Sequence, residues 1–168
     1  MRFSETKFPQ AIVLQPEVFR DERGYFKETY SAEKYAHAGA PGPFVQDNVS
    51  VSRKGVLRGL HYDLRMAKLV HCLEGEIYDV IVDMREDSNT HKQWDAVRLS
   101  GENHRQLYVP AGFAHGFYVC SEIAIVAYKQ TALYDPAQER AVNWQDPSIG
   151  VEWPLDGLPI LSAKDSGA

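Results

Sequence analysis

The segment KLVHCLEGEIYDVIVDM, residues 68–84, decides the expected fold. Two strand-like stretches, Lys68–Leu73 and Glu76–Met84, flank Glu74-Gly75, a turn signal typical of a β-hairpin. The second stretch alternates between one face with Tyr78, Val80, Val82 and Met84 and another with Ile77, Asp79, Ile81 and Asp83. This period of two predicts an antiparallel strand pair, with carboxylates set among isoleucines on one face.

The same period recurs along the chain, with turn residues between the segments. Further strands are expected at Ile12–Leu14, Tyr25–Tyr30, Asn48–Arg53, Trp94–Leu99, Gln106–Val109, Gly116–Val119 and Ile123–Lys129. Only Ser31–Ala38 resembles a helix, with Ser31 at its N-cap, and the tail Ile160–Ala168 is expected on the surface. Many short strands with little helix indicate an all-β barrel or sandwich, and without a repeat or linker residues 1–168 are expected to form a single domain.

Composition narrows the class of protein. The 168 residues carry 18 Lys and Arg against 23 Asp and Glu, a formal charge of −5, which argues against a nucleic-acid-binding protein. The longest wholly apolar run, Ile123–Tyr128, is far shorter than the roughly 20 residues needed to cross a membrane. The N-terminal residues lack the apolar region of a secretory signal, so a cytoplasmic protein without membrane or nucleic-acid partners is expected.

The six histidines differ in their sequence contexts. His37, His91 and His104 lie in polar, loop-like stretches and are expected on the surface, and His71 is expected to be partly buried in a strand. His61 and His115 instead have glycine neighbours, which would let a ligand approach the backbone closely.

A metal site was the first chemistry to consider for His61 and His115. Pro110-x-Gly112-x-x-His115 resembles the second half of the metal-binding cupin pattern. The first half would need two histidines one residue apart, but here the sequence is His61-Tyr62-Asp63, with Lys68 where a ligand is expected. A lysine ammonium repels a cation, so we expect no metal here.

Acid–base chemistry beside a ketone fits these residues better. Removing a proton next to a carbonyl needs a base with a pKa near neutral, a cation at the carbonyl oxygen, and an acid that returns the proton. His61 can be the base, Lys68 can stabilise the enolate oxygen, and Tyr128 can deliver the proton from the other face.

Longer stretches then reveal a resemblance that covers nearly the whole chain. The sequence resembles the dTDP-4-dehydrorhamnose 3,5-epimerase family, which are nucleotide-sugar epimerases of the cupin type that use no metal. The most specific stretches are FRDERGYFKE (19–28), FVQDN (44–48), VLRGLHY (56–62), VPAGFAHGF (109–117), AYK (127–129) and LSAKD (161–165). The resemblance implies an all-β, cupin-type jelly-roll barrel with short peripheral helices.

The resemblance also implies a role for individual residues. His61 would be the general base with Asp165 as its orienting partner, Lys68 would steady the enolate, and Tyr128 would be the acid. The residues expected to bind the nucleotide sugar are Arg23, which contacts a phosphate, and Phe26, Glu28, Gln46, Asn48, Arg58, His115 and Tyr134. Relatives form homodimers in which N-terminal strands cross to the neighbour, so Phe26 is expected to reach the partner's site.

The expected activity is therefore cofactor-independent epimerisation of a nucleotide-diphospho-4-keto-6-deoxy sugar, with dTDP-4-dehydro-6-deoxy-D-glucose as the favoured substrate and C3 and C5 as the inverted centres. The loop Tyr62–Ala67 is shorter than in typical members of the family. This leaves open inversion of C3 or C5 alone on another nucleotide-linked keto sugar, such as a GDP-linked heptose. A cupin that binds a sugar nucleotide without catalysis is the remaining alternative.

Overall fold

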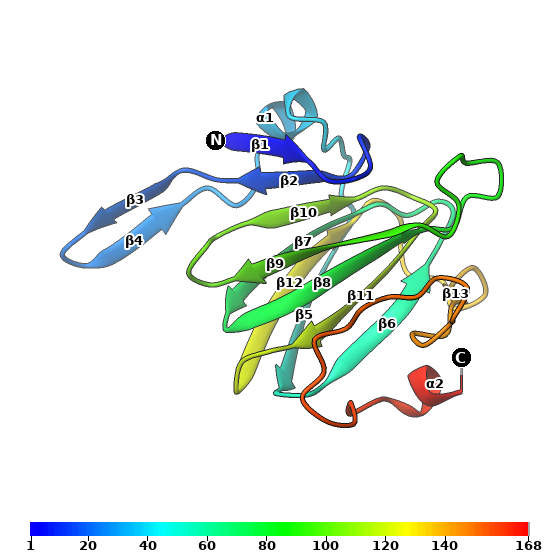
Figure 1. Cartoon of the computed structure of the whole chain (residues 1–168). Helices are drawn as coiled ribbons and strands as arrows, with labels where there is room; N and C mark the ends of the chain where they lie inside the picture. Colours follow the sequence, from blue (N-terminus) through cyan, green and yellow to red (C-terminus); the bar gives the residue numbers. More distant parts are fainter. Residues whose placement is uncertain (168) are drawn as a thin grey trace.

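A computed structural model describes residues 1–167, and two antiparallel sheets pack face to face (Figure 1). The first sheet consists, in spatial order, of β1 (Arg2–Glu5), β2 (Ile12–Gln15), β10 (Gln106–Val109), β7 (Lys68–Glu74), β12 (Ile123–Gln130) and β5 (Gln46–Arg53). The second consists of β13 (Arg140–Ala141), β6 (Leu57–Tyr62), β11 (Phe113–Val119), β8 (Glu76–Asp83) and β9 (Trp94–Ser100). The all-β jelly-roll prediction is confirmed.

The main core lies between the two sheets, and its residues come from alternate positions of facing strands. Val70 and Cys72 of β7 and Val126 of β12 pack with Ile77 and Ile81 of β8 in one buried cluster. The alternation predicted for residues 76–84 is therefore confirmed, since the isoleucines point toward the opposite sheet.

Parts of both outer faces of the sandwich are covered as well, although Val49 and Val51 of β5 stay exposed. The helix α1 (Ala32–His37) packs through Tyr35 on the first sheet, where its hydroxyl donates to Gln106 Oε1 at 2.7 Å. Residues 142–153 cover the second sheet, so Val80 and Val82 of β8 are buried on that side too. Ser31 stands at the N-cap of α1, as predicted, although its side chain makes no capping hydrogen bond.

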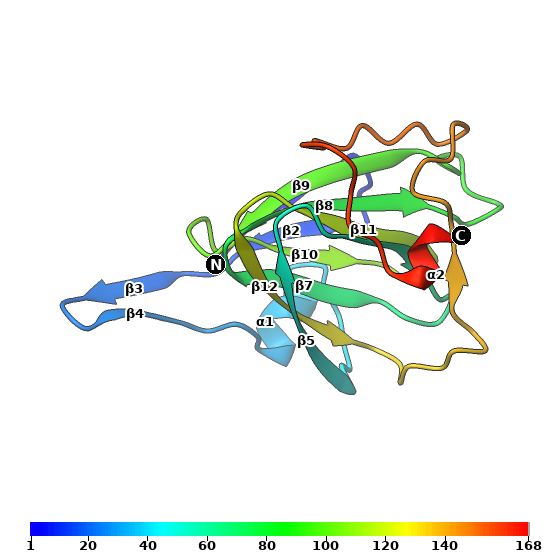
Figure 2. The same ribbon diagram turned by 90° about the horizontal axis from the view of Figure 1, so that it is seen from below.

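A third, two-stranded sheet forms an arm that projects from the sandwich (Figures 1 and 2). It consists of β3 (Val18–Asp21) and β4 (Gly24–Lys27), and β4 is shorter than the strand predicted at Tyr25–Tyr30. One face of the arm exposes Phe19 and Phe26, which are opposite each other in register.

The opposite face of the arm is fastened to the body at His104. This ring lies 4.8 Å from that of Tyr25 and is only 5% exposed, so the prediction of a surface His104 is wrong. The reason is that the arm, which sequence patterning did not resolve, covers it.

The tail expected on the surface is also partly wrong. Ile160 pairs with the start of β6, since Leu57 N donates to Ile160 O at 3.0 Å and Ile160 N donates to Gly55 O at 2.8 Å. The tail then forms the one-turn helix α2 (Ala163–Ser166), in which Asp165 is buried. Ala168 lies outside the described residues.

Within residues 1–167, no helix is long and apolar enough to cross a membrane.

Candidate active site

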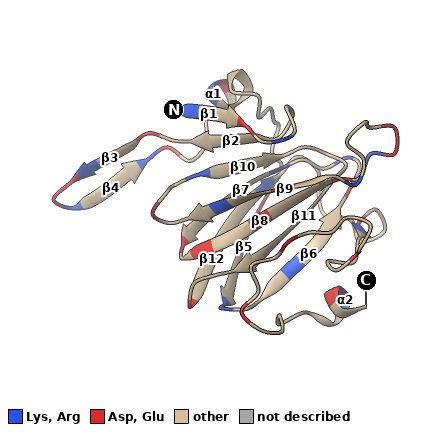
Figure 3. Ribbon diagram, viewed as in Figure 1, with Lys and Arg blue, Asp and Glu red and all other residues tan. Residues whose placement is uncertain are grey.

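A cavity of about 210 Å³ opens between the sheets, beside α2. Its walls come from both sheets and from the tail: Ser50, Arg58, His61, Lys68, His115, Gly116, Phe117, Tyr128, Ser162 and Asp165. All four residues expected to take part in catalysis are among them, together with Arg58 and His115. Figure 3 shows a basic segment within β6 and charged residues on the nearby helix α2.

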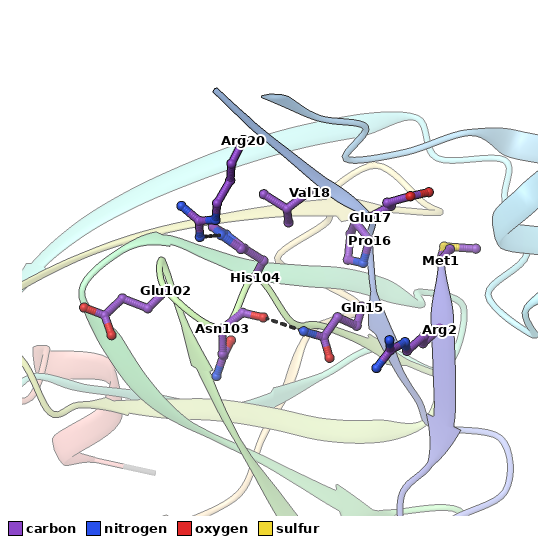
Figure 4. A pocket seen from close by; sticks show the side chains of 10 residues that line it. All are labelled: Met1, Arg2, Gln15, Pro16, Glu17, Val18, Arg20, Glu102, Asn103 and His104. Atoms are coloured by element: carbon purple, nitrogen blue, oxygen red, sulfur yellow. Dashed lines mark hydrogen bonds between the residues drawn. The ribbon is translucent and has the colours of Figure 1, made fainter. Parts of the chain in front are cut away.

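Larger hollows lie elsewhere, but they lack such a convergence of groups. One of about 570 Å³ lies where the arm leaves the body and is lined mainly by Arg2, Gln15, Glu17, Arg20 and His104 (Figure 4). Acid–base chemistry needs a base, an acid and an oxyanion donor around one space, and the smaller cavity supplies all three.

Two glycines bring β6 and β11 close enough to build the cavity wall. A Cβ on Gly59 would lie 2.5 Å from the Gly116 Cα, and a Cβ on Gly116 would lie 2.5 Å from the Arg58 carbonyl oxygen. In a regular strand, side chains three residues apart point to opposite faces. The register between these strands shifts between His115 and Phe117, so Arg58 and His61 nevertheless both reach the cavity. The two glycines thus allow close backbone-to-backbone packing, and Gly116 also lines the cavity.

His61 is held by a carboxylate on one ring nitrogen. Its Nε2 lies 2.7 Å from Asp165 Oδ1, and its Nδ1 lies 3.8 Å from Glu139 Oε1. Burial lowers the pKa of His61 below its usual 6.5, although the charges of Asp165 and Glu139 oppose this shift. At neutral pH the ring is therefore uncharged, donates Nε2–H to Asp165, and keeps the lone pair on Nδ1 for a proton.

Lys68 stands at the first position of β7, on the opposite sheet from His61. Burial lowers its pKa to about 8, while the charges of Glu139, Asp79 and Asp63 oppose that shift. The half-buried side chain therefore still carries its charge at neutral pH, and an ammonium beside a ketone can stabilise the negative charge of an enolate.

Tyr128 enters the cavity from β12, which also belongs to the sheet opposite His61. Burial raises the pKa of its phenol, and the Arg58 charge only partly offsets this. The phenol is therefore protonated at neutral pH and can act as an acid. The imidazole of His61 and the phenol of Tyr128 thus line one cavity from two different sheets.

His115 forms a second histidine–carboxylate pair, which the sequence analysis did not identify. His115 lies directly opposite His61 in the β6–β11 register, and its Nε2 is 2.7 Å from Asp79 Oδ1. Both residues of the pair are buried. Within residues 1–167, Asp79 Oδ2 has no hydrogen-bond partner. A carboxylate alternating with isoleucines in a core strand was the signal that could have suggested this pair.

Gln46, Asn48 and Tyr134 lie beside the cavity rather than in its wall. Gln46 Nε2 donates to Asn48 Oδ1 at 2.9 Å, and Tyr134 N donates to Gln46 Oε1 at 2.9 Å. The Tyr134 hydroxyl in turn donates to Glu139 Oε2 at 3.2 Å, and Glu139 approaches His61. Glu139 lies in an irregular segment with no recognisable pattern, so the sequence analysis missed it.

Arg23, Phe26 and Glu28 lie away from the cavity of their own chain. Arg23 is at the tip of the arm, paired with Asp21 at 2.5 Å, and Phe26 is 70% exposed on the arm (Figure 2). Glu28 follows the arm and pairs with Lys34 at 3.1 Å. The structure therefore divides the expected binding residues between the cavity region and the arm.

Known proteins share this architecture and sequence over almost the full length. Residues 5–168 match the family described as dTDP-4-dehydrorhamnose 3,5-epimerase. The enzyme of that name from Salmonella typhimurium is 49% identical over 98% of this chain and 92% of its own, and the one from Pseudomonas aeruginosa is 49% identical over 98% and 93%. The chain belongs to the dTDP-4-dehydrorhamnose 3,5-epimerase family.

A solved structure of this family gives the same result for the fold. The crystal structure of dTDP-6-deoxy-D-glucose-3,5-epimerase from Legionella pneumophila, in complex with dTDP-4-keto-L-rhamnose, is 46% identical, with a TM-score of 0.96 over 99% of this chain and 90% of that one. The resemblance stated from the sequence motifs is therefore confirmed.

Proposed function

We propose that the protein epimerises dTDP-4-dehydro-6-deoxy-D-glucose at C3 and C5 without a cofactor. The observation that carries this proposal is the single cavity into which His61 enters from one sheet and Lys68 and Tyr128 from the other. Inversion of a carbon requires a proton to leave one face of the sugar ring and another to arrive at the opposite face. Groups on two facing sheets suit that requirement, and the family membership supports the substrate class.

The chemistry follows from the protonation states. The 4-keto group acidifies the hydrogens at C3 and C5, and Nδ1 of His61 removes one of them as the ring becomes an imidazolium. The electron pair of the broken C–H bond moves into the enolate, whose oxygen Lys68 stabilises. Tyr128 then donates its proton to the same carbon from the other face, and proton exchange with solvent restores the neutral His61 and the phenol. Asp165 holds the ring and stabilises the imidazolium.

We propose that the nucleotide part of the substrate lies toward Gln46, Asn48 and Tyr134. A pyrophosphate carries about two negative charges, which suit arginine forks such as those of Arg58 and Arg23. Because Arg23 and Phe26 lie on an arm away from their own cavity, we infer a homodimer in which each arm reaches the partner's site. The exposed face with Phe19 and Phe26 would be covered in such an exchange.

Solvent exchange tests the activity. The protein is incubated in D2O with dTDP-4-dehydro-6-deoxy-D-glucose and followed by NMR, and we expect deuterium at both C3 and C5 together with inversion. Deuterium at one carbon alone would assign a one-centre epimerase, and exchange only with a GDP-linked keto sugar would change the assigned nucleotide. Binding without exchange on any 4-keto nucleotide sugar would overturn the proposal in favour of a non-catalytic cupin.

Subunit mixing tests the exchanged arms. An Arg23→Ala chain and a His61→Asn chain, each strongly impaired alone, are co-expressed. If the arm acts in the partner's site, the mixed dimer has one site with both His61 and an intact arm, so about a quarter of the wild-type activity returns in a random mixture. Mixed dimers that remain inactive would contradict this arrangement.

A further inference from the structure

Asp165 can orient His61 only if its own carboxylate is held in place. Two sets of contacts made by the C-terminal tail provide this support. The first set consists of backbone hydrogen bonds between Ile160 and the start of β6, the same strand that carries His61 near its other end. The base and the segment that bears its carboxylate partner are therefore fastened to one strand.

The second set is a reciprocal pair of hydrogen bonds between Ser162 and Asp165. Ser162 is the N-cap of α2, and its Oγ accepts from Asp165 N at 3.1 Å. The same hydroxyl donates to Asp165 Oδ2 at 2.8 Å, since a carboxylate that accepts from His61 has no proton to give. Ser162 therefore fixes both the backbone and the side chain of Asp165.

The two carboxylate oxygens of Asp165 thus have separate partners. Oδ1 accepts from His61 Nε2 at 2.7 Å, and Oδ2 accepts from Ser162 Oγ. The terminal torsion of an aspartate has a broad energy minimum, so one hydrogen bond leaves the carboxylate plane free to turn. The second bond removes that freedom, and Asp165 is only 4% exposed, so water has little access to replace it.

We propose that Ser162 is a positioning residue for catalysis, which holds the Asp165 carboxylate in the orientation that keeps the proton of His61 on Nε2 and the lone pair on Nδ1. This inference rests on the proposed function, because it assigns Ser162 a part in the work of the same base. Ser162 borders the cavity, but its one hydroxyl proton is committed to Asp165. Its effect therefore reaches the substrate through His61.

The test compares Ser162→Ala with Ser166→Ala. Ser166 is the matched control, because its hydroxyl donates to Ser162 O at 2.9 Å in the same helix, whereas the Asp165 carboxylate accepts from His61 and Ser162. We expect Ser162→Ala to lower kcat about 10- to 100-fold, as expected for loss of a hydrogen bond to a charged group, with KM and thymidine diphosphate affinity unchanged within about twofold. Ser166→Ala should keep kcat within about twofold of wild type.

Two further variants separate positioning from helix stability. Ser162→Gly still suits an N-cap but has no hydroxyl, so its kcat should fall as in Ser162→Ala, whereas Ser162→Thr should recover activity to within about threefold of wild type. In an Asp165→Asn background, Ser162→Ala should add less than about a twofold loss, because the carboxylate to be positioned is gone.

The outcomes distinguish this inference from the proposed function. A wild-type protein without epimerase activity would overturn the proposed function. An active wild type with Ser162→Ala equal to Ser166→Ala, with Ser162→Gly at full kcat, or with the whole loss in KM would overturn the role of Ser162 alone.

Discussion

His61 and His104 are both largely buried, and each has a charged side chain near both of its ring nitrogens. These side chains are negative at His61 and positive at His104. Asp165 and Glu139 face His61. By contrast, Arg20 Nη2 lies 3.1 Å from His104 Nε2 (Figure 4), and Lys27 Nζ lies 3.1 Å from His104 Nδ1. Burial is the main cause that lowers both pKa values. At His61 the two carboxylates oppose this shift and Lys164 adds to it, whereas at His104 both neighbouring cations add to it.

The difference shows what a buried histidine needs to act as a base. After it takes a proton, the imidazolium must be stabilised by its surroundings, which carboxylates do and cations do not. His61 can therefore cycle between its two charge states, while His104 serves as a neutral anchor under Tyr25 at the root of the arm.

The largest expected effect separates the two histidines by activity. His61→Asn should lower kcat by about 10²- to 10⁴-fold, the usual contribution of a general base, with thymidine diphosphate binding retained by calorimetry. The matched variant His104→Asn should keep kcat at saturating substrate within about threefold of wild type. Equal losses in the two variants would contradict the contrast between the sites.

Replacing the carboxylate at His61 should have the next largest effect. Asp165→Asn removes the negative charge but keeps the shape, so the imidazolium loses its stabilising partner and kcat should fall about 100-fold with a small change in KM. Steady-state kinetics measures this. If the asparagine variant turns over at the wild-type rate, Asp165 has no part in supporting the base.

The sequence predicted the sandwich well, because the period of two is strong wherever a strand has a core to face. Strands β5, β7, β8, β9, β10 and β12 all overlap their predicted positions. It did not indicate β6 as a strand, since Gly59 and the shifted register break the alternation there. The strand β3 was missed because its arm has no core to face, so its residues remain exposed and unpatterned.

The residues of the candidate site likewise fall into those that the sequence identified and those that it did not. His61, Lys68, Tyr128 and Asp165 could be named from motifs, and they line one cavity. Glu139 was missed because its segment has no pattern, and Asp79 was noted only as a carboxylate among isoleucines, since its partner His115 lies far away in sequence. The surface position predicted for His104 failed for a similar reason, since a polar loop context says nothing about an arm that folds over it.

The pH dependence of kcat/KM also distinguishes His61 from His104. The reaction needs a neutral His61, whose pKa lies below 6.5, and a protonated Lys68, whose pKa is about 8. We therefore expect kcat/KM to be highest between these values, to fall at lower pH as His61 gains a proton, and to fall at higher pH as Lys68 loses one. His104→Asn should leave both limbs in place, and a shift of the acid limb in that variant would contradict the assignment.

The smallest expected effect concerns stability at the root of the arm. His104→Ala removes the one ring nitrogen that accepts a hydrogen bond, from either Arg20 or Lys27, which should cost about 1 kcal/mol and lower Tm by about 2–4 °C at neutral pH. Because the folded state lowers the pKa of His104, the unfolded chain gains this proton first as pH falls, so wild type loses stability below pH 6.5. Thermal unfolding should therefore show a smaller deficit of the variant at acid pH, and a larger one would contradict this account.

We propose that His61 on one sheet and Tyr128 on the other act on opposite faces of one sugar ring. NMR in D2O on Tyr128→Phe and His61→Asn tests it most directly. Without the phenol, His61 should still remove the hydrogen and return deuterium to the same face, giving exchange with retained configuration, while His61→Asn should give neither exchange nor inversion. Inversion by Tyr128→Phe at the wild-type rate, or exchange by His61→Asn, would contradict the account.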